Sequence, residues 1–450
     1  MKDKVSRLVN VRPGEWKLVF SMLSLLAINM MVLEVSEVVA TTGFIASVGT
    51  AQVPWLWIAD MFVILLSVGA YAAIVDRQPR VRLVSWLYAG FGLSYLVILS
   101  LFVSGISTWL NYFLLYLLAD QQYILFPLAF WALANDLYTM SESKRLFPLI
   151  AAGTAIGSIM GNTVAAGAAT VLGRPELSSV GLLALDGLMC VIGLIAVRLL
   201  FRARTIRARR STSADGRGRE TFRIGLDFVK KVPIFRYLAI AMFLAGLCLT
   251  IIEYNFLFTV DQVFGQDSAR FQAFYGAYKV VTIVSTLLFQ WLIAGRLLGK
   301  IGLKSAFLVL PASLVAAAGM ALGLRGILGG VGGRFLARLV QRGLDEPSRR
   351  SLQGLIPDER RGSVSAFLDS YLYAVATLVG CVVLVVLAWL ASSGKLPGEM
   401  VPLVYLLVGA LAALGAVWAA LRLRATYDVS MLNWRLARSR RRSVLDGIEF

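Results

Sequence analysis

The sequence contains no histidine and only three cysteines among its 450 residues. Histidine is the commonest protein metal ligand and the usual proton-transfer group near neutral pH, so its absence removes many kinds of catalytic site. Cys190, Cys248 and Cys381 each fall inside a different apolar stretch, which excludes a disulfide framework and a cysteine metal site. No nucleophile stands beside a base. We therefore predict no metal, no cofactor and no enzymatic activity.

Charge is also scarce, because 16% of the residues are charged and 58% are hydrophobic. This composition would make an insoluble globule but is typical of a polytopic membrane protein. A hydrocarbon core about 30 Å thick requires about 20 apolar residues of helix. Twelve stretches satisfy this length: residues 17–41, 54–75, 82–104, 108–135, 147–171, 179–201, 234–260, 270–293, 303–323, 327–346, 363–391 and 400–423. The predicted fold class is an all-α membrane protein with 12 transmembrane helices.

One basic connection divides these helices into six plus six. We predict an N-terminal six-helix half over residues 1–201 and a C-terminal half over 234–424. Residues 202–233 form the linker, whose end (222–232) has the amphipathic pattern of a short helix lying at the membrane interface. Residues 425–450 form a basic tail. We expect the protein to be a monomer.

Lysine and arginine are distributed unequally between the two ends of these helices. Of 44 such residues, only Arg174, Arg270, Arg325 and Lys395 lie in odd-numbered connections. The positive-inside rule therefore predicts that both termini and the 202–233 linker are cytoplasmic. As a separate expectation, we place the protein in a bacterial inner membrane. The net charge of +18 could suggest nucleic-acid binding. However, the basic runs lack interleaved aromatic residues, so we assign them to anionic lipid at the cytoplasmic face.

Several ionisable residues interrupt the apolar stretches. Glu34 and Glu37 lie three apart in the first stretch, on one helical face, and Glu253 lies in the first stretch of the second half. Such groups are costly in hydrocarbon and should face a cavity or a partner. The others are Asp60, Asp120, Lys279 and Asp369. Two interpretations stay open, namely a structural ion pair of Lys279 with Glu253 or Glu34, and direct contact with a substrate.

The tenth stretch carries Arg334, Arg338 and Arg342, spaced by four and therefore on one helical face. Guanidinium groups suit bidentate contact with phosphate or carboxylate. We assign Arg342 to the cytoplasmic end, where it meets lipid phosphate, and Arg334 to an inward-facing anion contact. The glycines at 326–333 lack the Gly-Lys-Ser/Thr of a phosphate-binding P-loop and follow no strand, which argues against ATP hydrolysis.

Two cytoplasmic turns at equivalent places in the halves resemble the Gly-x-x-x-Asp-Arg-x-Gly-Arg-Lys turn of the major facilitator superfamily. They are Ala72-Ala-Ile-Val-Asp76-Arg77-Gln-Pro-Arg80 and Gly295-Arg-Leu-Leu-Gly299-Lys300. The resemblance implies a pseudo-symmetric 6+6 bundle with a site between its halves near the bilayer midplane.

A second resemblance is more specific. Phe130-Trp131-Ala-Leu-Ala-Asn135-Asp136, followed by Ser141-Glu142-Ser-Lys144-Arg145-Leu-Phe147 and Gly153, is similar to a signature of the ATP/ADP translocase (nucleotide transporter) family. Asp345-Glu-Pro-Ser-Arg349-Arg350 and Glu253-Tyr254-Asn255-Phe256 are similar to its elements in the second half. Leu257 replaces a lysine common in bacterial relatives, and an arginine is missing after Asp369, which weakens a triphosphate assignment specifically.

The resemblance and the buried charges together predict a secondary transporter that moves an anionic metabolite by alternating access, with exchange of nucleotides of the ATP/ADP type as the specific expectation. The residues that we expect to bind substrate are Lys279, Arg334, Arg338, Tyr254 and Asn255. The residues expected to carry protons or form ion pairs are Glu34, Glu37, Asp60, Glu253 and Asp369. The residues expected at a cytoplasmic gate are Asp76, Arg77, Asp136, Glu142, Lys144, Arg145, Arg349 and Arg350.

Two alternatives remain. A proton-coupled carrier of another small solute would use Glu34, Glu37 and Asp60 as proton sites. A membrane sensor or scaffold without transport is the other, although the chain supplies no soluble effector domain.

Overall fold

The computed structural model describes residues 11–12, 15–75, 78–172, 175–201, 218–265, 267–324, 326–353, 356 and 358–445. Asp76 and Arg77, two of the expected gate residues, lie outside this set. Within the described residues all regular structure is helical, and eleven helices are long and apolar enough to cross a membrane. The all-α polytopic fold predicted from composition is therefore confirmed.

The chain divides into two compact units, which are described separately. The first unit comprises Met1–Ser213 and Asp261–Val284. It contains the helices α2 (Trp16–Val48), α3 (Val53–Val75), α4 (Arg80–Val103), α5 (Thr108–Leu137), α6 (Met140–Leu172) and α7 (Pro175–Phe201). It also takes in the end of α9 (Pro233–Phe264) and most of α10 (Ser268–Phe289), which the sequence places in the second half.

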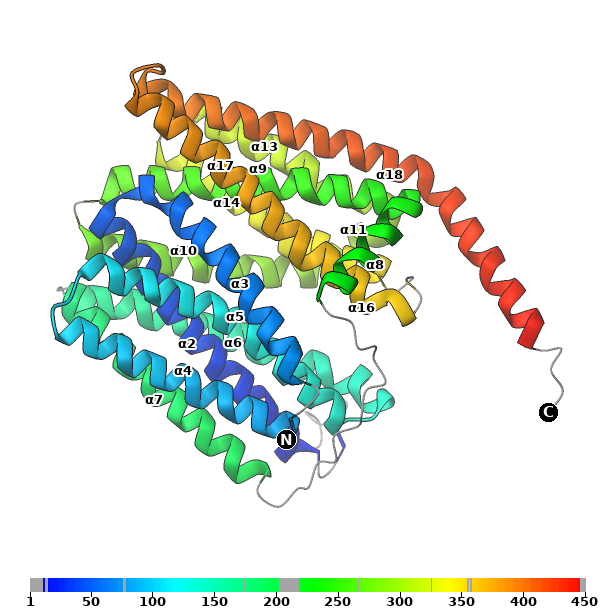
Figure 1. Cartoon of the computed structure of the whole chain (residues 1–450), viewed down its shortest axis with the longest axis horizontal. Coiled ribbons are helices and arrows are strands. Elements are labelled where there is room, and N and C mark those ends of the chain that lie inside the picture. Colours follow the sequence, from blue (N-terminus) through cyan, green and yellow to red (C-terminus); the bar gives the residue numbers. More distant parts are fainter. Residues whose placement is uncertain are drawn as a thin grey trace. The chain divides into compact units, whose positions relative to one another are not determined.

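The second unit comprises Ala214–Val260 and Ser285–Phe450. Besides most of α9, its long elements are α8 (Gly218–Lys231), α13 (Val309–Gly323), α14 (Ile327–Val340), α17 (Leu372–Ser392) and α18 (Val401–Leu445). Its short elements are α11 (Gly295–Ile301), α12 (Leu303–Ala306), α15 (Glu346–Gln353) and α16 (Asp358–Ala366). Figure 1 labels most of these helices along the chain.

Three π-helical turns interrupt helices of the second unit. They are η2 (Gln290–Ala294), η3 (Gln341–Asp345) and η4 (Phe367–Tyr371). A π-turn inserts one residue into the helical repeat and commonly marks a functional segment. Through η3, α14 and α15 form one continuous helical stretch over 327–353, where the tenth span was predicted. Arg334, Arg338 and Arg342 give this stretch too much charge to count among the eleven apolar helices, so the predicted number of twelve is not reproduced.

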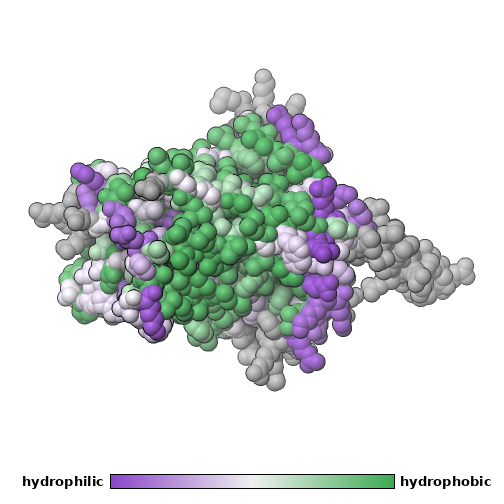
Figure 2. All heavy atoms as spheres, turned by 90° about the horizontal axis from the view of Figure 1, so that it is seen from above, coloured by the Kyte–Doolittle hydropathy of each residue, from purple (hydrophilic) through white to green (hydrophobic). Residues whose placement is uncertain are grey.

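Apolar side chains cover the outer surface of the helices. On the face drawn in Figure 2, hydrophobic residues form a continuous band and hydrophilic residues gather at its edges. Phe20, Leu66 and Trp291 are among the large apolar side chains that are more than half exposed. A water-soluble protein rarely exposes so large a contiguous apolar surface, whereas lipid tails are the natural solvent for it.

The amphipathic segment expected at 222–232, at the end of the linker, lies in α8 (Gly218–Lys231), and its position at the membrane interface stays a prediction. Its Val229 belongs to a buried cluster with Ile234, Phe235 and Phe367, against which Leu226 and Phe228 also pack. A Cβ on Gly225 would come 2.5 Å from the Cβ of Phe367. The apolar side of α8 is therefore occupied by protein, namely α16 and η4.

The first unit is organised around the close packing of α6 on α2. Gly153, Gly157 and Gly161 recur every fourth residue of α6 and face the α2 backbone. A Cβ on Gly153 or on Gly161 would lie 2.5 Å from the carbonyl oxygen of Leu23 or Met31, respectively. Small residues at this spacing let membrane helices approach until their backbones touch. This approach brings α6 side chains within hydrogen-bonding distance of the α2 carboxylates.

We predict that Gly157→Leu destabilises the folded protein, because a side chain there collides with the backbone at Ala27. Overpacking of this kind costs at least about 1–3 kcal/mol. Gly167→Leu is the matched control on the same helix, since a Cβ there meets nothing within 4 Å. The melting temperatures of both variants in detergent test this prediction, and that of Gly157→Leu should be the lower of the two. Equal melting temperatures would show that the α2–α6 contact does not limit stability.

Candidate functional site

A lysine held between two carboxylates forms the centre of the first unit. The Nζ atom of Lys279 in α10 lies 2.6 Å from an Oε2 of Glu34 and 2.9 Å from that of Glu37, both in α2. Lys279 is 9% exposed and Glu34 6% exposed. In addition, Asn162 of α6 donates from Nδ2 to Glu34 at 2.9 Å. We call these four residues the lysine cluster.

Local sequence explains how these groups meet. Glu34 and Glu37 share one face of α2 because they are three residues apart. Gly161 lets α6 approach α2, which places the neighbouring Asn162 against Glu34. Gly276, one turn before Lys279, does the same for α10, since a Cβ there would lie 2.8 Å from the Asn162 carbonyl oxygen. Of the two ion pairs weighed for Lys279, the structure contains the pair with Glu34.

In the second unit the ratio of acidic to basic groups is reversed, because one carboxylate pairs with two arginines. Glu253 of α9 accepts from Arg334 Nε at 2.8 Å and lies 2.5 Å from Arg334 Nη2. Arg338 donates from Nη2 to the same carboxylate at 2.9 Å. The Arg334 side chain is 8% exposed, that of Glu253 14% and that of Arg338 23%. We call these three residues the arginine cluster.

The surroundings fix the plane and position of the arginines. The Arg334 guanidinium carbon lies 4.1 Å from the ring centroid of Phe256, which is fully buried. Arg338 also donates from Nη1 to Gln341 at the start of η3, at 3.0 Å. Gly333 packs on the carbonyl oxygen of Ala317, and Gly330 packs on Thr259 of α9. The glycine run therefore serves helix packing, which brings the arginine face of α14 against α9.

Tyr254 and Asn255 lie beside Glu253 on α9. Asn255 accepts a hydrogen bond from the hydroxyl of Tyr405 in α18 at 3.0 Å. The ring of Tyr254 meets that of Tyr405 edge-on, with the centroids 5.5 Å apart. Tyr254 and Asn255, which were both predicted to bind substrate, are thus buried within the second unit. Tyr405, which was not selected from the sequence, joins them.

The expected gate residues of the first unit make contacts at helix ends. Arg145 donates to both carboxylate oxygens of Glu15, at 2.8 and 2.7 Å. These hydrogen bonds hold the pKa of Glu15 below its usual value. Asp136 lies 3.9 Å from Arg80 Nε. The side chain of Lys144 falls outside the described residues.

Glu142 completes a capping box at the start of α6. Its carboxylate accepts from the backbone N–H of Thr139 at 2.8 Å and from the Thr139 hydroxyl at 2.9 Å. The Glu142 N–H donates back to that hydroxyl at 3.4 Å. The same Thr139 donors hold the pKa of Glu142 below its usual value. The contacts of this expected gate residue are therefore those of a helix cap.

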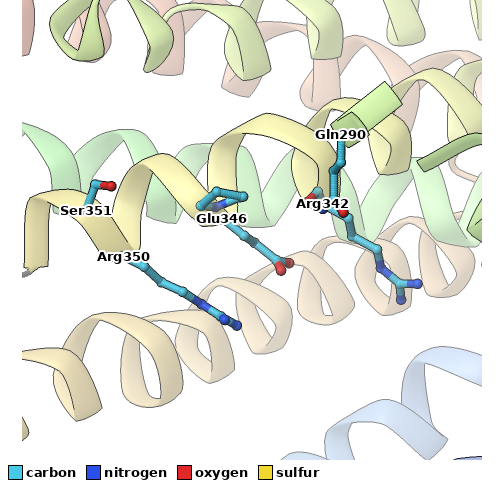
Figure 3. Close-up of a pocket in the computed structure, with 6 residues that line it drawn as sticks. Gln290, Arg342, Glu346, Arg350 and Ser351 are labelled. Atoms are coloured by element: carbon cyan, nitrogen blue, oxygen red, sulfur yellow. Dashed lines mark hydrogen bonds between the residues drawn. The ribbon is translucent and has the colours of Figure 1, made fainter. Parts of the chain in front are cut away.

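The expected gate residues of the second unit surround η3 and η4. Arg349 donates to Asp345 at 2.8 Å and to Asp369 at 3.1 Å. Asp369 also accepts from Gln353 at 2.9 Å. Arg350 lines an open cavity of about 480 Å³. In Figure 3, the side chains of Arg342, Glu346 and Arg350 extend from one side of the helical stretch, and Gln290 reaches it from η2.

A carboxylate pair completes the polar core of the first unit. Asp60 of α3 has no exposed surface, and neither of its carboxylate oxygens meets a hydrogen-bond donor. Its neighbour is Asp120 of α5, which was recognised from sequence as an ionisable group but not as a site residue. Asn162, Glu15 and Arg80 were not selected at all, because nothing in the sequence marks the rotation of their helices.

We predict that Lys279→Met destabilises the protein by about 3–5 kcal/mol, the usual cost of leaving a buried carboxylate without its partner. The triple variant Lys279→Met, Glu34→Gln, Glu37→Gln removes all three charges and should recover most of the loss. Lys304→Met is the control, since its pair with Asp428 is exposed and should be worth no more than about 1 kcal/mol.

Detergent unfolding curves measure all three variants. A triple variant as unstable as Lys279→Met would show that the lysine contributes packing and not charge compensation.

Solved structures similar to this chain are membrane transporters. A mutant of the nucleoside transporter NupG superposes with a TM-score of 0.66 at 15% identity, covering 88% of this chain and 98% of that one. A POT family transporter in complex with a thioalcohol-conjugated peptide gives 0.62 at 12% identity, covering 91% and 96%. A bacterial homologue of the human lysosomal transporter Spinster gives 0.57 at 13% identity, covering 94% and 98%. At these identities the likeness concerns the fold alone, which is of the major facilitator type.

No curated protein matches the sequence. The family model described as TLC ATP/ADP transporter, however, matches residues 96–325, which is more than half of the 450 residues. The match begins in α4 and extends to the end of α13, so it includes Lys279, Glu253 and the Phe130–Gly153 signature. The chain therefore belongs to the TLC ATP/ADP transporter family.

Proposed function

We propose that this protein exchanges anionic metabolites of the nucleotide class across a membrane by alternating access, with the arginine cluster as the substrate's phosphate site. One observation carries this proposal: two guanidinium groups at α14 share the single carboxylate of Glu253. The three residues of the cluster together carry a formal charge of +1 within a mostly buried setting. Family membership and the transporter fold support the same assignment.

The electrostatic argument starts from the cost of burying charge. A buried cation is stable only when paired, and an arginine in a membrane protein marks a substrate or ion pathway by default. Glu253 compensates one of the two arginines fully. A second anion would complete the balance, and phosphate oxygens match the planar guanidinium fork in a bidentate manner. Phe256 holds the Arg334 plane in place, so little side-chain freedom would be lost on binding.

Lys279 is assigned a different role within this proposal. Its amine already faces two carboxylates, so a substrate anion would have to displace both. We therefore assign Lys279 to an ion pair that holds α10 against α2, and not to direct substrate contact in the state described. The lysine cluster would then stabilise the first unit, while the arginine cluster receives the substrate.

The orientation and the helix-end contacts complete the proposal. The bias of lysine and arginine toward the even-numbered connections supports cytoplasmic termini. We propose a bacterial inner membrane as the location. On that orientation the pairs Arg145–Glu15 and Arg349–Asp345 lie at the cytoplasmic ends of their helices. There they would fix helix ends that move as rigid pieces during the cycle.

The direct test uses purified protein in liposomes preloaded with ADP. Labelled ATP added outside should enter in exchange, and liposomes without internal nucleotide should take up far less. Phosphate, phosphorylated sugars and an uncharged nucleoside serve as competitors. Folded protein that exchanges none of the phosphorylated compounds would refute the proposal.

Variants of the arginine cluster sharpen this test. We predict that Arg334→Gln weakens nucleotide binding at least about tenfold, or about 1.4 kcal/mol, because it removes a charge-assisted bidentate contact. Glu253→Gln should strengthen binding, since it removes the resident carboxylate that competes with phosphate for both arginines. Arg342→Gln is the matched control on the same helical stretch, because its side chain lines the open cavity.

Nucleotide-dependent changes in thermal stability report binding even for variants that do not transport. Weaker binding in both Arg334→Gln and Glu253→Gln would mean that the cluster is a structural pair and not an anion site.

A further inference from the structure

A second site lies in the first unit, where two aspartates meet without any donor between them. Asp60 of α3 is completely buried, and both of its carboxylate oxygens lack a hydrogen-bond donor. Asp120 of α5, a helix that packs against α3, is the acidic group that interacts with it. The two helices are also joined by a hydrogen bond from the hydroxyl of Ser67 to Gln121, the residue next to Asp120. The contact between the carboxyl groups is therefore part of a regular helix–helix interface.

Two ionised carboxylates cannot occupy this arrangement at an acceptable free energy. Each is an acceptor only, so neither can satisfy the other, and their like charges repel strongly away from water. One proton resolves both problems, because it turns one carboxyl into a donor and leaves a single charge shared by the pair. Aspartic proteases, with a proton shared between two carboxylates, are the known precedent for this chemistry.

We propose that Asp60 and Asp120 form a proton-binding site within the first unit, linked electrostatically to the lysine cluster. Asp120 interacts electrostatically with Glu37 of α2 and Lys279 of α10, and both aspartates interact with Tyr116 of α5. Asp120 thus links the buried Asp60 electrostatically to the Glu37–Lys279 ion pair. This site is separate from the arginine cluster and does not depend on what that cluster binds.

The pair favours a proton over a metal cation. Hard cations such as Ca²⁺ require about six to eight oxygen ligands, and Mg²⁺ requires six in near-octahedral geometry. Within the described part of the chain, no group of three or more acidic or thiol side chains is placed to hold a metal ion. Two carboxyl groups that face each other lack a hydrogen-bond donor, and one proton on either of them supplies that donor.

Loss of the proton would change the lysine cluster. A second negative charge on the aspartate pair would attract the ammonium group of Lys279, which is held at 2.6 and 2.9 Å by Glu34 and Glu37. The competition would weaken the hold of α2 on α10. Protonation of the pair thereby sets how firmly α10 is bound within the first unit, which is a means of coupling proton uptake to a conformational step.

Infrared difference spectroscopy of the purified protein tests the site without any transport assay. The wild type at neutral pH should show the carbonyl stretch of one protonated carboxyl group from this pair. That band should disappear in Asp60→Asn and equally in Asp120→Asn, because the asparagine amide supplies the donor and leaves the remaining aspartate ionised. Asp267→Asn is the control, since Asp267 is exposed and paired with Arg270, and it should lose only an ionised carboxylate band.

Two results would overturn the proposal. The first is a protonated-carboxyl band that persists in either asparagine variant. The second is a wild-type pair that is fully ionised at neutral pH and whose carboxylate bands shift on addition of Na⁺, which would make it a cation site.

A transport arm gives an independent readout. Any pH dependence of exchange should be lost in Asp60→Asn and in Asp120→Asn but kept in Asp267→Asn. If the pH dependence persists in Asp60→Asn and Asp120→Asn, the aspartate pair is not coupled to transport. Failure of nucleotide exchange would leave the infrared result unaffected, so the two proposals fail separately.

Discussion

Compensation of charge in a medium without water is the constraint on which the rest of this structure depends. Each unit buries a small ionic cluster, and each cluster is unbalanced by one charge. Two carboxylates face one ammonium group at Lys279, whereas one carboxylate at Glu253 faces two guanidinium groups. A purely structural ion pair would be expected to balance. These opposite imbalances fit the two proposals, in which the arginine cluster binds an anion and the lysine cluster is linked to a proton-binding pair of aspartates.

Close helix packing makes these clusters possible. Hydrocarbon provides no hydrophobic force between helices, so the contact must come from backbones that fit closely. The glycines of α6 bring Asn162 to Glu34, and the glycines of α14 bring Arg334 to Glu253. In both places the small residues precede or adjoin in sequence the side chain that they bring into contact. The glycine run before Arg334 is therefore the means by which a long cationic side chain reaches an acidic partner on α9.

Much of the fold follows from the sequence because the bilayer imposes a single length on every span. The expected stretches 303–323 and 108–135 correspond closely to observed helices. The depth of Lys279 within its span left an ion pair and substrate contact open, and the structure contains the pair with Glu34. The capping role of Glu142 was not predicted, although Thr139 three residues before it is the signal of a capping box. The Asp60–Asp120 contact was not predicted either, because it depends on the rotation of two helices about their own axes. An apolar pattern on every face leaves that rotation undetermined.

The imbalance at α14 also bears on why a carrier of this kind would exchange its substrates. An arginine pair with a net positive charge is least stable when its anion is absent, so the empty site resists the rearrangement that turns it across the membrane. Glu253 reduces this penalty by compensating one of the two charges. In the proposed cycle, the site with bound substrate has less net charge and can reorient, whereas the empty site keeps its net positive charge and reorients less readily. This difference favours exchange over net transport. The ratio of exchange to net transport is then set by the carboxylate of Glu253, because its distance from the two arginines decides how well it replaces a phosphate group.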